Sequence, residues 1–84
     1  MTRVDIRDAL DQHVRKRLED SFGKGVAMMI WASAHGASNI SSLDPDRDGY
    51  MRFVEAVCGD QRVVDMWGKS GAEHALQQWK ALVC

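Results

Sequence analysis

The sequence predicts an all-α fold: a compact bundle of about five short helices that includes one helix-loop-helix unit. Two observations predict it. Apolar residues recur at helical spacing along most of the chain, and Pro45 is the only proline among 84 residues. With 45% hydrophobic and 27% charged residues, a chain of this length has the composition of one globular domain, residues 1–84, without room for a second core.

The first helix is predicted over residues 3–20. Its apolar positions recur every four residues, with charged residues between them, so one stripe faces the core and the rest faces water. The stripe consists of Ile6, Leu10, Val14 and Leu18.

Glycines then interrupt the pattern at Gly23 and Gly25. The seven residues 26–32 are all apolar, which predicts a central helix buried on nearly every side. Beyond a break or kink at Gly36, Ile40 begins a further helical turn that ends before Pro45, because the residue before proline disfavours helical geometry.

The second half of the chain predicts three more helical pieces. A short helix covers residues 51–57, and a further turn or two over 63–67 is closed by Gly68. Ser70 and Glu73 have the spacing of a capping box and begin a last helix that runs close to the end of the sequence.

Charge and apolar patterning exclude several function classes. Lys and Arg number 11 against 12 Asp and Glu, so the chain lacks the positive charge that phosphate backbones attract, and a nucleic-acid partner is not expected. The longest apolar stretch has seven residues, too short for a membrane span. Cys58 and Cys84 are too few and too far apart for a disulfide framework, so we expect reduced thiols and a cytoplasmic protein.

The informative motif is a twelve-residue acidic segment, residues 44–55. Aspartates alternate at Asp44, Asp46 and Asp48, Gly49 follows directly, and Glu55 ends the segment. These residues match every fixed position of D-x-[DN]-x-[DN]-G-x5-E. A hard cation such as Ca²⁺ takes about seven oxygen ligands, which such a loop supplies by turning alternate side chains inward. In this segment the chain resembles the EF-hand family.

The resemblance implies a Ca²⁺ site, with Mg²⁺ or a lanthanide as alternative occupants. Its ligands would be the carboxylates of Asp44, Asp46, Asp48 and Glu55 and the backbone carbonyl of Tyr50. EF-hands usually work in pairs, but no second segment has comparable ligands. A second copy of the chain is therefore a candidate partner, and so is another protein.

An alternative interpretation of the acidic segment remains open. The acidic side chains are also suited to cap the following helix without binding metal, because Asp is favoured at helix starts. The chain would then be a small protein-interaction module, an adaptor or inhibitor, that acts through a helical face containing Trp and Met. Met conforms to different partners, although core packing is its commoner use. The residues concerned are Trp31, Trp67, Trp79, Met28, Met29, Met51 and Met66.

No feature indicates an enzyme. Gly68-Lys69-Ser70 resembles the end of a phosphate-binding loop, but Val63 stands where that loop requires its first glycine. The three histidines lie on separate predicted segments without the paired spacing of a zinc site. They are His13, His35 and His74.

Overall fold

The computed structural model describes residues 5–40 and 46–83. These residues form helices and no strand, which confirms the all-α prediction. In chain order the elements are α1 (Ile6–Asp8), the π-helix η1 (Ala9–Arg15), α2 (Lys16–Ser38), α3 (Arg47–Cys58) and α4 (Gln61–Leu82). Because α1, η1 and α2 follow one another without a gap, the described residues make three continuous helical runs, so the helix count differs from the predicted five.

A glycine of non-helical geometry divides each of the two long runs into two helices that meet at a kink. Gly23 has φ 81° and ψ 164°, and Gly68 has φ 77° and ψ 163°. Residues with a Cβ almost never adopt this conformation, so glycine is required at both bends. The predicted interruptions at these two positions are confirmed, whereas Gly25 and Gly36 lie inside the helix.

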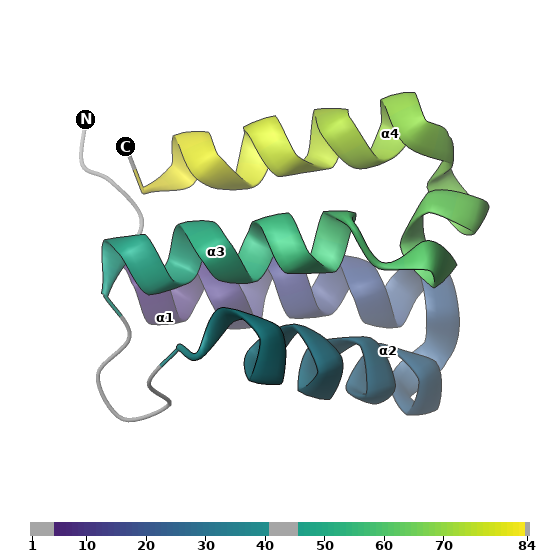
Figure 1. The fold of residues 1–84 in the computed structure, drawn as a ribbon, viewed down its shortest axis with the longest axis horizontal. Helices are drawn as coiled ribbons and strands as arrows, with labels where there is room; N and C mark the ends of the chain where they lie inside the picture. Colours follow the sequence, from purple (N-terminus) through teal and green to yellow (C-terminus); the bar gives the residue numbers. More distant parts are fainter. Residues whose placement is uncertain (1–4, 41–45, 84) are drawn as a thin grey trace.

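The helical segments pack side by side, with α3 in the middle (Figure 1). After the bend at Gly23, residues 24–38 of α2 run along one side of α3, and α4 runs along the other side. We call residues 24–38 the outer segment of α2. The first helical segment, which ends at the bend, lies behind α3 in this view and packs against the outer segment.

The hydrophobic core is formed by a stripe of buried apolar side chains from each helical segment. Val14 and Leu18 of the first helix are fully buried, as their spacing predicts. Phe53 is buried in this core, and the half-buried Trp31 packs against it edge to face, with the ring centroids 4.7 Å apart. The largest fully buried side chains are Tyr50, Phe53, Leu18, Ile30, Val14, Val54, Val57 and Val63.

The prediction that residues 26–32 form a central buried helix is wrong. Only Ala27 and Ile30 in this stretch are buried, whereas Met28 is 67% and Met29 59% exposed. The outer segment lies at the edge of the bundle, so its neighbours cover one side of it only. That side is the stripe Ala27, Ile30, Ala34 and Ser38, at the spacing of one helix face.

Two predicted helix starts also differ from the structure. Ser70 is exposed inside α4 and does not cap a new helix, because the bend at Gly68 lets the chain resume helical geometry at once. The other, α3, begins at Arg47 rather than Met51. No helix in the described ranges is long and apolar enough to cross a membrane.

Candidate functional site

The acidic segment starts α3 through a helix cap. Asp46 precedes the first helical residue, and its Oδ1 accepts a hydrogen bond from the backbone N–H of Gly49 at 2.7 Å. This satisfies one of the amide groups left free at a helix start. The cap explains why α3 begins four residues before the predicted start. Asp44, the first predicted ligand, lies outside the described residues.

Tyr50 and Glu55 tie α3 to α4. The Tyr50 side chain is fully buried, and its hydroxyl donates a hydrogen bond to the carbonyl oxygen of Trp79 at 2.7 Å. That carbonyl belongs to the last turn of α4, where helices leave acceptors unpaired. Glu55 accepts a hydrogen bond from the ammonium of Lys80 at 2.8 Å, in a partly exposed ion pair.

The described ligands do not converge on one point. Asp48 and Glu55 are seven residues apart in one continuous helix, which separates them by about 10 Å along its axis. Ca²⁺ ligands lie at about 2.3–2.6 Å from the ion, whereas a Glu55 carboxylate oxygen here pairs with the ammonium of Lys80. Among the described residues, no three His, Cys, Asp or Glu side chains are grouped to hold a metal. The described carboxylates are therefore not gathered around one metal position in this conformation.

Gly49 is explained by close packing. In a calcium loop the glycine permits a sharp backbone reversal, but in the described chain positive φ occurs only at Gly23, Gly68 and Asn39. A Cβ added to Gly49 would lie 2.8 Å from Asp46 Oδ1 and 3.0 Å from Ile40 Cγ1. The residue must therefore be small, because a cap and a buried side chain press against it.

Arg52 links α3 to α2, on the other side of α3 from α4 (Figure 1). Its Nε donates a hydrogen bond to the carbonyl oxygen of Ser38, the last residue of α2, at 3.1 Å. The segment thus holds one end of α2 through Arg52 and one end of α4 through Tyr50. Its polar residues have a structural use whether or not a metal binds.

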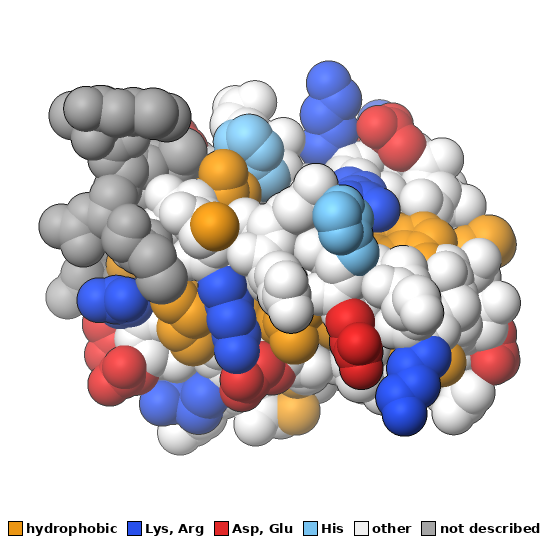
Figure 2. Space-filling view, turned by 90° about the horizontal axis from the view of Figure 1, so that it is seen from above, with side chains coloured by type: hydrophobic (Ala, Val, Ile, Leu, Met, Phe, Trp, Pro, Cys, Tyr) orange, Lys and Arg blue, Asp and Glu red, His pale blue; other side chains and the backbone are white. Residues whose placement is uncertain are grey.

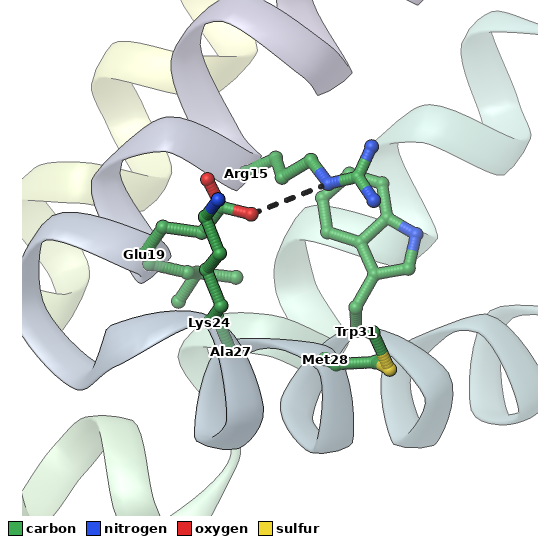
Figure 3. Close-up of a pocket in the computed structure, with 7 residues that line it drawn as sticks. Arg15, Glu19, Lys24, Ala27, Met28 and Trp31 are labelled. Carbon is green, nitrogen blue, oxygen red and sulfur yellow. Dashed lines mark ion pairs between the residues drawn. The ribbon is translucent and has the colours of Figure 1, made fainter.

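A separate hollow of about 370 Å³ lies between the first helical segment and the outer segment of α2 (Figure 3). Arg15 closes one edge: its Nε is 3.7 Å from Glu19 Oε2, and its guanidinium carbon lies 5.7 Å from the centre of the Trp31 ring. The lining residues are Arg15, Leu18, Glu19, Lys24, Ala27, Met28 and Trp31.

Beside this hollow, α2 exposes a face that carries no charge. Residues 25–38 include no Asp, Glu, Lys or Arg, although such residues make up 27% of the chain. We define the outer face of α2 as the exposed residues of this stretch that succeed one another at helical spacing: Gly25, Met28, Met29, Ala32, Ser33, Gly36 and Ala37. An uncharged exposed face that includes two large methionines is unusual for a surface that meets only water.

Neither glycine of the outer face is required by close packing or by backbone conformation within the described residues. A Cβ at Gly25 or Gly36 would meet nothing within 4 Å, and neither residue has positive φ. Glycine inside a helix costs about 0.5–1 kcal/mol relative to alanine. The sequence indicates this surface by small residues that recur at helical spacing along residues 25–37. The apolar composition of residues 26–32 instead favours a buried helix, so sequence reasoning misses the surface.

The opposite side of the molecule is different. The view onto α4 shows acidic, basic and histidine side chains dispersed over the surface, with small apolar patches between them (Figure 2). Lys69, Glu73 and His74 are among the exposed residues of α4. The uncharged character is thus particular to α2 and is not a general property of the surface.

The remaining candidate residues supply no site. His13 and His74 are exposed, and His35 packs edge to face against Phe53 with the ring centres 6.4 Å apart. Burial raises the pKa of the Cys58 thiol to about 12, so the thiol stays protonated at neutral pH and is a poor nucleophile. Cys84 lies outside the described residues.

The tryptophans and methionines divide between core and surface. Trp79 is buried, and Trp31 and Trp67 are half-buried against the core. Core packing therefore accounts for the tryptophans. Of the methionines, Met51 is half-buried against the core, while the other three are more than half exposed, so core packing does not account for them: Met28, Met29 and Met66.

Comparison of the chain with models of protein families, with curated proteins and with solved structures finds no significant match in any of the three.

Proposed function

We propose that this chain is a small helical protein-interaction module that binds a protein partner through the outer face of α2. The observation that carries the proposal is the exposure of Met28 and Met29, at 67% and 59%, on a helical stretch without a charged residue. Burying apolar surface contributes about 25 cal/mol per Å², and an uncharged face loses no ionic hydration when it is covered.

The hollow beside the face suits one anchoring side chain of the partner. Leu18, Ala27 and Trp31 give it apolar walls, while Arg15 and Glu19 at its rim form an ion pair and need no further partner. Interfaces concentrate binding energy in a few side chains that fill such pockets, within a surrounding apolar contact. Met28 lines the hollow and also belongs to the outer face, so the two form one continuous surface.

Site-directed photo-crosslinking in cells of the source organism tests the proposal. A benzophenone amino acid is placed at Met29 and, as a control, at Gln77, which is exposed on α4. We expect discrete covalent adducts from position 29 and none from position 77. The same adduct pattern from both positions would show that the outer face has no partner of its own.

A calcium titration separates this proposal from the metal-binding hypothesis, which rests on the spacing of the acidic residues. For Ca²⁺ to bind, the first two turns of α3 would have to unwind and the Tyr50–Trp79 hydrogen bond would break. We therefore expect the melting temperature and tryptophan fluorescence to stay unchanged up to millimolar Ca²⁺. Glu55→Gln should have the same small effect with Ca²⁺ and with chelator, since it weakens a partly exposed ion pair with Lys80. A saturable rise in melting temperature that Glu55→Gln abolishes would establish the calcium site instead.

A further inference from the structure

We infer that the partner of the outer face is a second copy of this chain, which packs its own α2 antiparallel against the first about a two-fold axis. This inference rests on the proposed function and specifies its partner. In this register each residue from 25 to 36 faces one residue of the other copy, and the two residue numbers add up to 61. Gly25 thus faces Gly36 of the other copy, and Met29 faces Ala32.

The absence of charge favours a second copy over an unlike partner. A two-fold axis brings each surface against itself, so a charged residue near the axis would meet its own like charge. Residues 25–38 avoid this repulsion entirely because none of them is charged. They also offer no ionic pattern by which an unlike partner could be selected.

The side-chain sizes are complementary in this register. Each exposed methionine meets a small residue of the other copy: Met29 meets Ala32, and Met28 meets Ser33. At both ends a glycine faces a glycine, which lets the two helices approach closely. The free space around Gly25 and Gly36, which nothing in the fold fills, is then occupied by the second copy.

The positive charge of Lys24, next to the outer face of α2, also favours an antiparallel pair of α2 helices. Lys24 precedes the outer face, and the described residues give it no ion pair. In the register above it lies opposite Ala37, in the last turn of the other α2. The carboxyl end of a helix carries partial negative charge, so an ammonium is favoured there. A parallel arrangement would bring the two lysines together instead.

The expected dimer is of moderate affinity. The paired stretch of 12 residues spans about 18 Å of helix, which is short for the roughly 800 Å² that each partner buries in a standard interface. We therefore expect dissociation in the micromolar range.

Sedimentation equilibrium of the purified chain tests the dimer across a hundredfold range of concentration. The average mass should rise from that of one chain toward twice that value. Met29→Glu should remain monomeric at every concentration, because it places two carboxylates near the axis. Gln77→Glu, which adds the same charge on the exposed side of α4, should dimerise as the wild type does. A wild-type mass that stays at one chain throughout would overturn the inference.

Cysteine crosslinking tests the direction and register. In a Cys84→Ser background, we expect the double variant Gly25→Cys/Gly36→Cys to form disulfide-linked dimers under mild oxidation. Each single variant alone should not, whereas an equimolar mixture of the two single variants should. Crosslinking of the single variants by themselves would indicate a parallel pair and contradict the register. Circular dichroism verifies that each variant is folded.

The two proposals can fail separately. If the purified chain is monomeric but position 29 crosslinks in cells to a different protein, the outer face is an interaction surface and the homodimer is wrong. If position 29 crosslinks to nothing in cells and the chain is monomeric, both proposals are wrong.

Discussion

Replacing Phe53 with alanine is expected to remove a large part of the stability of this small domain. Phe53 is 1% exposed, and the half-buried ring of Trp31 packs against it edge to face. Truncation of a buried Phe to Ala typically costs about 3–5 kcal/mol, because apolar burial is lost and a cavity remains. A domain of this length has a total stability of about 4–13 kcal/mol, toward the lower end for a small core. Urea unfolding, followed by circular dichroism and tryptophan fluorescence, measures the loss.

Met29→Ala is the matched control for this substitution. It also removes a large apolar side chain, but from a position that is 59% exposed, so we expect a change within about 0.5 kcal/mol at concentrations where the chain is monomeric. Phe53→Leu should be intermediate, since it keeps much of the buried volume. If Phe53→Ala and Met29→Ala were equally mild, the assignment of core and surface on α2 and α3 would be wrong.

The sequence predicts a helix stripe well where charged residues mark the other side. Val14 and Leu18 lie in such a stripe, with charged neighbours that can only face water, and both are fully buried. Residues 26–32 have no charged neighbours, so composition does not indicate which side meets the core. That choice depends on where α3 and the first helical segment lie, which is a property of the tertiary fold.

The acidic segment illustrates a different limit of sequence reasoning. An aspartate before a helix, a glycine three residues later and a glutamate beyond fit a metal loop and a helix cap alike. The structural use of these residues depends on contacts with distant parts of the chain. Ile40 packs against Gly49, and the Tyr50 hydroxyl reaches Trp79, 29 residues away. Such contacts are set by the fold and are not readable from local spacing.

Gly49→Ala is expected to destabilise the chain by about 1–3 kcal/mol, equally with Ca²⁺ and with chelator present. The new methyl group would lie 2.8 Å from Asp46 Oδ1 and 3.0 Å from Ile40 Cγ1, so either the cap or the buried contact must give way. This cost exceeds the gain of about 0.5–1 kcal/mol that alanine normally brings inside a helix. Chemical unfolding in the two buffers measures the change.

Gly36→Ala provides the matched comparison, with the opposite sign expected. A Cβ there would meet nothing within 4 Å, so at concentrations where the chain is monomeric only the helix gain of about 0.5–1 kcal/mol should remain. The contrast between two helical glycines isolates the packing around Gly49 from helix propensity. If Gly49→Ala were neutral in chelator and removed a stabilisation by Ca²⁺, the glycine would instead serve a metal-binding loop, because only then would its effect depend on the ion.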